Sequence, residues 1–134
     1  MTDEQLIGLL REHEISPTPQ RIAIARILLP KPRHMSADDI ISEVRHKSRS
    51  VSKATVYNTL NLFVERGLLK DLNIDQDRVI FDSNTAHHHH IYNMDTGELT
   101  DICPTTVEFA RLPDLPTDTE PDSVQITFRV RGAA

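Results

Sequence analysis

Four consecutive histidines, His87 to His90, are the residues of this chain best suited to chemistry. Burying four imidazoles in a core would cost desolvation free energy and return little packing, so the run favours metal binding. Successive side chains of a strand point to opposite faces. An extended run therefore predicts that His88 and His90 face one way and His87 and His89 the other, so that one segment supplies ligand pairs to two metal sites.

Carboxylates lie close to this run in the sequence, at Asp82, Asp95, Glu98, Asp101 and Glu108. Nitrogen and oxygen ligands without a thiolate suit Fe(II), Mn(II) or Zn(II). A solvated polar loop is the alternative interpretation of the histidines. A purification tag would stand at a terminus, whereas this run is internal and flanked by strand-like sequence.

The length and the charge distribution of the chain limit the possible number of domains and the kinds of partner. A chain of 134 residues makes one domain or two small ones. The net charge of −5 is uneven: residues 1–80 hold 12 Lys/Arg and 11 Asp/Glu, and residues 81–134 hold 3 Lys/Arg and 9 Asp/Glu. The first region therefore tolerates a polyanion, and the second attracts cations.

Cysteine usage and hydropathy indicate where the protein works. The single cysteine, Cys103, allows no disulfide framework and no cysteine-based zinc knuckle within one chain, and it fits a reducing cytosol. The N-terminus lacks the features of a signal peptide. No apolar run approaches the ~18 residues of a membrane-spanning helix. We therefore expect a cytoplasmic protein without a membrane segment.

Residues 1–82 predict a winged helix-turn-helix. Capping residues and proline or glycine positions predict four helices: from Thr2 or Asp3 to Glu14, from Thr18 with Pro19 first, from Ser36, and from Ser52 to Gly67. Two strands follow, at 68–74 and 78–81, joined by a turn at 75–77. Whether such a motif binds DNA depends on the exposed residues of its fourth helix.

Residues 83–86 read as a polar hinge, and residues 87–134 as a second, small α/β region. The pattern predicts strands at 87–94, 98–102 and 124–130, a short helix at 104–111 and a loop at 112–122. Three strands alone are marginal, which favours completion by dimer pairing. The expected class is α+β, with a DNA-binding domain at 1–82 and a dimerisation and metal-binding domain at 87–134.

The fourth predicted helix carries a polar outer face. Its members are Ser52, Lys53, Thr55, Tyr57, Asn58 and Thr59. Asn58 could read adenine through two hydrogen bonds. The cations available for phosphates are Arg21, Arg45, Lys47 and Arg49. An ordinary amphipathic surface helix has the same pattern, so this segment alone leaves DNA binding open.

Several motifs together resemble the ferric uptake regulator (Fur) superfamily in order and spacing. They are Thr18-Pro19-Gln20-Arg21, His34-Met35-Ser36-Ala37-Asp38-Asp39-Ile40, Ala54-Thr55-Val56-Tyr57-Asn58-Thr59-Leu60 and the histidine run. The resemblance covers residues 15–108. It implies a dimeric, metal-sensing transcription factor with an N-terminal winged helix and a C-terminal dimerisation domain.

The resemblance also implies two metal sites. The regulatory hinge site would take its ligands from His34, Asp82, His88, His90 and Asp101. One ion bound by both domains would fix their relative angle and so gate DNA affinity. The second site would use His87, His89 and Glu108; its usual fourth histidine is missing, because Gln125 and Ile126 stand there. Aspartates at both carboxylate positions resemble the peroxide-sensing branch.

The chain departs from the usual family pattern in two respects that bear on its branch. Asn93 and Thr96 stand where many members have a Cys-x-x-Cys pair, which excludes a structural zinc held by four cysteines. Asn58 replaces the usual arginine. These features and the long histidine run are most similar to the iron response regulator (Irr) branch, which senses iron status through haem. This implies haem contact by His88, His89 and His90, and Cys103-Pro104 resembles a haem-regulatory dipeptide unless Cys103 is a small buried thiol.

The expected function is a metal- or haem-responsive transcriptional regulator, mainly a repressor, of iron and metal homeostasis genes. Its partners would be a double-stranded DNA operator and a second copy of the chain. A small His/Asp metalloenzyme and a metal-storage or chaperone protein are the alternatives. Catalytic sites keep an open coordination position, whereas five candidate ligands fill one, and no G-x-S-x-G motif is present. We therefore do not expect an enzyme.

Overall fold

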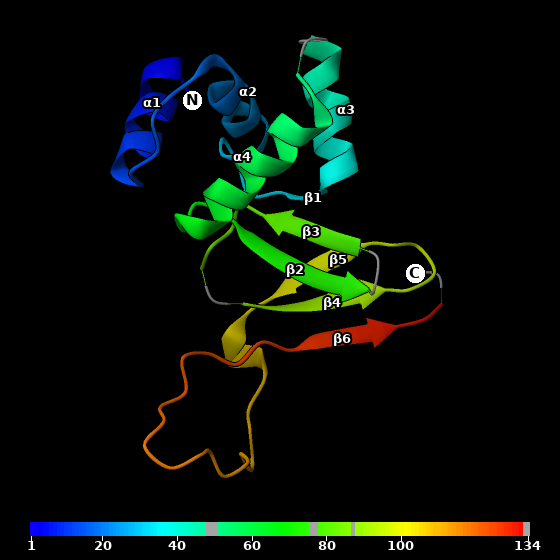
Figure 1. Cartoon of the computed structure of the whole chain (residues 1–134). Helices are drawn as coiled ribbons and strands as arrows, with labels where there is room; N and C mark the ends of the chain where they lie inside the picture. Colours follow the sequence, from blue (N-terminus) through cyan, green and yellow to red (C-terminus); the bar gives the residue numbers. More distant parts are fainter. Residues whose placement is uncertain (48–50, 76–77, 87, 133–134) are drawn as a thin grey trace. The chain divides into compact units, whose positions relative to one another are not determined.

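The computed structural model describes residues 1–47, 51–75, 78–86 and 88–132. The chain divides into two compact units, Met1–Thr85 and Ala86–Ala134 (Figure 1). The first unit holds four helices and a small sheet, and the second holds another small sheet. No helix in these ranges is long and apolar enough to cross a membrane.

The four helices of the first unit begin at the capping residues that the sequence predicts. They are α1 (Asp3–Glu12), α2 (Pro19–Leu28), α3 (Ala37–Lys47) and α4 (Lys53–Glu65). Thr2, Thr18 and Ser52 each accept a hydrogen bond from a backbone N–H of the first turn. These bonds satisfy donors that the helix itself leaves without a partner.

The end of α4 is set by Gly67, as predicted. Gly67 has φ +80, in the left-handed region that glycine adopts without strain. Its N–H donates to the Val64 carbonyl, and the Leu68 N–H donates to the Phe63 carbonyl. This Schellman arrangement turns the chain from α4 directly into the next strand.

A three-stranded antiparallel sheet completes the first unit, in the order β1-β3-β2 (Figure 1). Its strands are β1 (His34–Ser36), β2 (Lys70–Asp75) and β3 (Arg78–Asp82). The β2–β3 hairpin, called the wing below, was predicted, although residues 76–77 of its turn lie outside the described residues. β1 was not predicted, because three residues are too few to show an alternating pattern. Its last residue, Ser36, accepts a hydrogen bond from the Asp39 N–H at the start of α3.

The helices pack around one apolar core. Its central side chains are Leu6, Leu10, Ile24, Leu28, Ile40, Val44, Val56, Leu60 and Phe63. One expectation for the helix faces is corrected: Thr59, placed on the outer face of α4 by the sequence analysis, is only 5% exposed. Position 59 lies one turn from Val56 and Phe63, so it falls on the buried stripe.

The second unit is a sheet in the order β5-β4-β6. Its elements are β4 (His89–Asn93), β5 (Leu99–Ile102), the 3-10 turn η1 (Pro104–Thr106) and β6 (Thr127–Val130). β4 pairs antiparallel with β5 and parallel with β6. The turn after β4 holds the chain beyond β6, because the Asn93 amide donates to the Gly132 carbonyl and the Gly132 N–H donates to Asp95.

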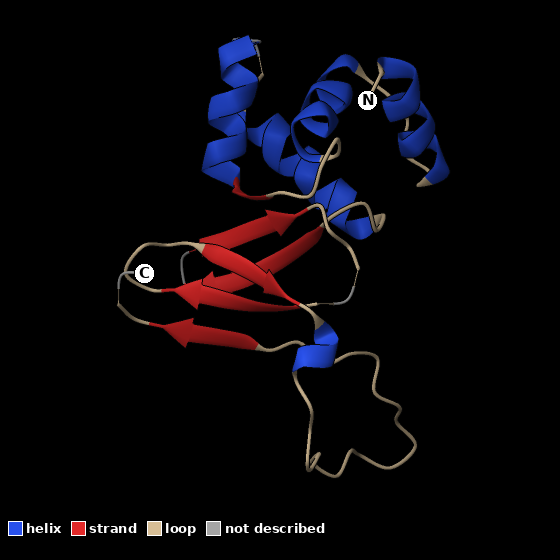
Figure 2. Ribbon diagram, turned by 180° about the vertical axis from the view of Figure 1, so that it is seen from behind, coloured by secondary structure: helices blue, strands red, loops and turns tan. Residues whose placement is uncertain are grey.

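The helix predicted at 104–111 is wrong. Only Pro104–Thr106 turns, as a 3-10 helix, and an irregular segment leads to β6 (Figure 2). The β-branched residues Thr105, Thr106 and Val107 disfavour a helix, and eight residues are too few to sustain one without packing. The predicted loop at 112–122 has no regular helix or strand, as expected, and the last strand starts at Thr127 rather than Val124.

Candidate metal centre and recognition helix

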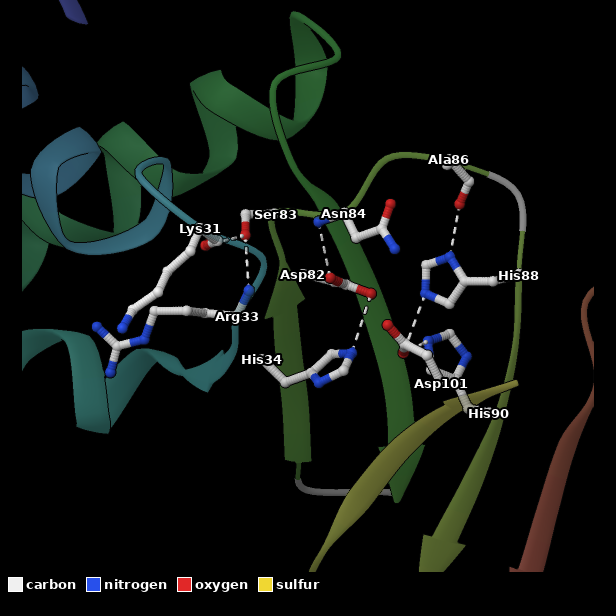
Figure 3. Close-up of polar contacts among 10 residues, drawn as sticks. All are labelled: Lys31, Arg33, His34, Asp82, Ser83, Asn84, Ala86, His88, His90 and Asp101. Carbon is white, nitrogen blue, oxygen red and sulfur yellow. Dashed lines mark hydrogen bonds and ion pairs between the residues drawn. The ribbon is translucent and has the colours of Figure 1, made fainter. Parts of the chain in front are cut away.

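The first unit presents a histidine and a carboxylate side by side. His34 on β1 is the register partner of Asp82 at the end of β3. The His34 Nε2 lies 3.2 Å from the Asp82 Oδ2 (Figure 3). Asp82 is only 1% exposed, so its carboxylate is held away from bulk water. Strand pairing therefore brings two metal-ligand types together.

The orientation of Asp82 follows from the turn after β3. The backbone N–H of Asn84 donates to the Asp82 Oδ1 at 2.9 Å (Figure 3). Such a bond to the amide two residues ahead is typical of aspartate at a strand end. One carboxylate oxygen is thereby fixed by the backbone, and the other is directed at His34.

The second unit gathers two histidines around one carboxylate. His90 on β4 is the register partner of Asp101 on β5, and His88 lies just before β4. The Nε2 atoms of His88 and His90 lie 3.2 and 3.3 Å from the Asp101 Oδ1. Their rings meet edge to face with centroids 4.5 Å apart. As the alternation predicted, residues 88 and 90 face the same way.

The tautomer of His88 indicates what this cluster is suited to bind. Its Nδ1 lies 2.5 Å from the Ala86 carbonyl oxygen and must donate to it (Figure 3). In neutral His88, Nε2 then carries a lone pair that faces a carboxylate oxygen. Two acceptors at this distance require a proton or a cation between them. A histidine that binds metal through one ring nitrogen usually donates the N–H of the other to a carbonyl or a carboxylate, which fixes the orientation of the ring. The donor set fits a divalent transition metal.

The second predicted ligand set is not brought together among the described residues. His89 is 2% exposed, and its Nδ1 accepts the Ile126 N–H at 3.1 Å. Glu108 is exposed on the irregular segment after η1, since the helix expected to carry it does not form. His87 lies outside the described residues. The position where the family pattern expects a fourth ligand therefore supplies a backbone donor to His89.

The predicted DNA-contacting residues of α4 divide into two groups. Lys53, Tyr57 and Asn58 are exposed, with Tyr57 at 41%. Ser52 and Thr55 serve the helix start: the Ser52 Oγ accepts the Thr55 N–H and lies 2.9 Å from the Thr55 Oγ1. The first group is thus available to a ligand, whereas the second is engaged in capping.

Three of the basic residues named by the sequence analysis, Arg21, Arg45 and Lys47, lie near helix ends. The Arg21 guanidinium donates to the Ser16 carbonyl at 2.8 Å, and the Arg45 Nε to the Val51 carbonyl at 3.5 Å. Lys47 is exposed at the end of α3, and Arg49 lies outside the described residues. Arg45 therefore helps to hold the segment that leads into α4.

A hollow of about 460 Å³ lies between α4 and the wing. Tyr57 and Asn61 line it from α4, and Asp71 and Arg78 from the wing. Sequence reasoning missed Asn61 and Arg78. Asn61 follows Tyr57 by four residues, a spacing that places both on one helix face. Arg78 could have been found from its place at the start of the second wing strand.

Cys103 is exposed and does not have the buried setting considered in the sequence analysis. Its Sγ lies 3.1 Å from the Thr105 Oγ1. Hydrogen bonds from the Thr105 side chain and backbone lower the pKa of the Cys103 thiol, because both stabilise the thiolate.

Comparison with known proteins identifies relatives over most of the chain. The ferric uptake regulator family matches residues 12–115. The peroxide-responsive repressor PerR of Staphylococcus epidermidis is 36% identical over 99 residues, which are 74% of this chain and 66% of that protein. The PerR of Staphylococcus aureus is 36% identical over 116 residues, 86% of this chain and 78% of that protein.

Solved structures have a similar fold. The ferric uptake regulator from Pseudomonas aeruginosa with manganese aligns with a TM-score of 0.74 at 24% identity, covering all of both chains. PerR from Streptococcus pyogenes aligns with a TM-score of 0.53 at 30% identity, covering 74% of this chain and 68% of that one. At 24% identity, the similarity to the Pseudomonas aeruginosa structure shows the fold alone. The α+β fold class predicted from the sequence is thus confirmed.

Proposed function

Because the chain belongs to the ferric uptake regulator family and is a metal-responsive transcription regulator rather than an enzyme, we propose that one divalent metal ion sets its affinity for DNA. The ligands of this regulatory ion are His34 and Asp82 of the first unit and His88, His90 and Asp101 of the second. The ligand set of the second unit carries the proposal. His88, His90 and Asp101 each offer a ligand atom within 4.8 Å of the others, and the Ala86 carbonyl fixes the nitrogen that His88 presents.

The ligands of the first unit stand next to the DNA-binding elements. His34 lies on β1, which leads directly into α3, and Asp82 ends the wing strand β3. When bound, the ion supplies a positive charge shared by ligands of both units. Holding His34 and Asp82 to the second unit would restrain the helix-turn-helix as a body. In a dimer, two recognition helices must match two half-sites, so this restraint changes DNA affinity.

A divalent ion is the regulatory ligand that the structure favours over haem. His88, His89 and His90 are each less than a tenth exposed. A haem iron needs open access to an imidazole nitrogen, and the haem response implied by the Irr resemblance would require this segment to open. The choice among Fe(II), Mn(II) and Zn(II) depends on supply and geometry. We propose iron, since two aspartates stand in the site and relatives at 36% identity are named peroxide-responsive repressors.

The DNA contacts proposed for the chain lie on α4 and its surroundings. Tyr57 and Asn58 would read base edges in the major groove, and Lys53 and Arg21 would contact phosphates. The hydroxyls of Ser52 and Thr55 are engaged in the cap of α4. These two residues would therefore support DNA binding by fixing where the recognition helix begins. A homodimer supplies the second recognition helix.

The test is the affinity of the purified protein for its operator in four states: metal-free, Mn(II), Zn(II) and haem. Salt must be held constant, because phosphate contacts make the affinity strongly salt-dependent. We expect a divalent ion to tighten specific binding. Binding that is strong in the metal-free state and abolished by haem would overturn the divalent-ion proposal in favour of the Irr-type one. Absence of specific binding in every state would overturn DNA regulation altogether.

The second metal site stays a prediction. His89 and Glu108 keep their candidate role, but the His89 Nδ1 is engaged by Ile126. A metal titration with a stoichiometry of two ions per chain would support it. One ion per chain, unchanged in Glu108→Gln, would remove it.

A further inference from the structure

Reciprocal hydrogen bonds tie the segment before β1 to the residue after β3. The Ser83 N–H donates to the Arg33 carbonyl at 3.1 Å. The Arg33 N–H donates to the Ser83 Oγ at 2.9 Å, and that hydroxyl donates onward to the Lys31 carbonyl at 3.4 Å (Figure 3). We call these three bonds the Ser83 latch. A single side-chain oxygen thus holds two residues of the opposite segment.

The latch stands next to the metal-ligand pair of the first unit. Arg33 precedes His34, and Ser83 follows Asp82, which is the register partner of His34. β1 has only three residues, so its ladder with β3 is short. The end of a short ladder opens readily unless further contacts hold it. Ser83 supplies those contacts at the end where His34 and Asp82 meet.

The segment held by Ser83 is also fixed to the helices. The Arg33 guanidinium donates to the Ile27 carbonyl at 3.0 Å, near the end of α2. It also binds Glu43 of α3 through two hydrogen bonds, the shorter at 3.0 Å. The backbone of Arg33 is thereby hydrogen-bonded to Ser83, and its side chain is hydrogen-bonded to both helices.

We propose that Ser83 is a positioning residue for the metal centre: its hydroxyl holds the His34 imidazole beside the Asp82 carboxylate, so that both ligands are in place before metal binds. The effect of Ser83 on metal binding rests on the proposed function, whereas the hydrogen bonds of the Ser83 latch do not depend on it. An ordinary turn serine would contribute only stability. A residue that orients ligands changes metal affinity about 10- to 100-fold when it is removed.

The test uses three variants of the full chain. Ser83→Ala removes the hydroxyl. Ser83→Thr keeps it, and Ser83→Val has nearly the shape of threonine without it. Ser42→Ala, an exposed position on α3, is the matched control for loss of a serine hydroxyl. Mn(II) affinity is measured by calorimetry, and the ring nitrogen shifts of His34 are measured by NMR in the metal-free protein at fixed pH.

We expect Ser83→Ala and Ser83→Val to weaken Mn(II) binding about tenfold and to move the His34 resonances. Ser83→Thr and Ser42→Ala should stay within twofold of the original protein. Comparison of threonine with valine keeps the test sharp if alanine impairs folding. Equal Mn(II) affinity across the Ser83 variants, with His34 resonances unchanged, would overturn the inference. If the unaltered protein binds no divalent metal ion, the proposed function fails, while the metal-free His34 shifts still decide whether the latch positions that ring.

Discussion

At the scale of single residues, successive histidines of the run make different contacts because their side chains alternate in direction. His88 and His90 turn their Nε2 atoms to Asp101, whereas His89 accepts a backbone hydrogen bond from Ile126. Neighbouring residues of the same type therefore have different expected roles. Alanine substitutions along the run can separate these roles.

His89→Ala and His90→Ala should affect different properties of the protein. Loss of His89 leaves a cavity and removes the partner of the Ile126 N–H, so the free energy of unfolding should fall by about 2–4 kcal/mol. Its Mn(II) affinity should stay within threefold of the original. His90→Ala should lose at least tenfold in Mn(II) affinity. Denaturant unfolding and metal titration measure the two effects, and a His90→Ala protein that keeps its metal affinity would contradict the assignment.

The reactivity of Cys103 should depend on Thr105. Because hydrogen bonds from Thr105 lower its pKa, the thiol forms thiolate at a lower pH than its ordinary value of 9.0. The rate of alkylation by iodoacetamide should therefore rise at a lower pH than that of a free cysteine. Thr105→Ala should shift this profile upward in pH but not abolish the effect, since the backbone N–H of residue 105 remains. Coincident profiles for the two proteins would rule out the role of the Thr105 hydroxyl.

At the scale of elements, α4 separates residues that build the helix from residues that remain exposed. Ser52 caps the helix, and Val56, Leu60 and Phe63 bury its inner face. Tyr57 and Asn58 project outward. Stability and DNA affinity should therefore respond to different substitutions within the same helix.

Tyr57→Ala should weaken specific operator binding about tenfold, the effect of losing one good base contact, without changing metal content. Ser52→Ala serves as the comparison, because loss of an N-cap should lower the free energy of unfolding by about 1 kcal/mol. Fluorescence anisotropy with operator and unrelated DNA, together with metal analysis, distinguishes the two. An unchanged operator affinity in Tyr57→Ala would remove this residue from the DNA interface.

Element by element, the sequence predicted what local chemistry dictates. Helix starts at Thr2, Thr18 and Ser52 and the stop at Gly67 follow from capping, which depends on neighbouring residues alone. β1 escaped prediction because its pairing with β3 joins residues nearly fifty positions apart. The helix expected at 104–111 failed because its pattern was weak and three of its residues, Thr105, Thr106 and Val107, are β-branched.

The candidate site was partly accessible to sequence reasoning for the same reason. Strand alternation placed His88 and His90 on one face, and the family resemblance added His34, Asp82 and Asp101. The Ser83 latch and the Ala86 carbonyl were not found. The Ser83 hydroxyl bonds to backbone atoms of Arg33 and Lys31, and the Ala86 carbonyl is itself a backbone group, so the types of the partner residues carry no signal for these contacts.

At the scale of the whole molecule, β6 leaves apolar side chains without cover in one copy of the chain. Phe128 is 46% exposed and Val130 39% exposed. Exposed apolar surface on a short edge strand favours pairing with a second copy. This agrees with the dimer proposed above for two half-site recognition.

Phe128→Asp should therefore shift the protein toward monomer at micromolar concentration and weaken operator binding, because one recognition helix would be lost from each complex. Val79→Asp, at an exposed valine of the wing, is the control for oligomeric state. Sedimentation velocity measures the distribution. A Phe128→Asp protein that sediments as the original does would place the dimer interface elsewhere.

The central claim is that metal bound by the His/Asp ligands sets DNA affinity. The most direct measurement is the ratio of operator affinity with Mn(II) to that without metal, at fixed salt, for the original protein, Asp101→Asn and the exposed control Glu98→Gln. Asp101→Asn keeps the shape of the side chain and removes the charge shared by His88 and His90. We predict a ratio well above one for the original protein and Glu98→Gln, and close to one for Asp101→Asn. A ratio that Asp101→Asn leaves unchanged would contradict the account.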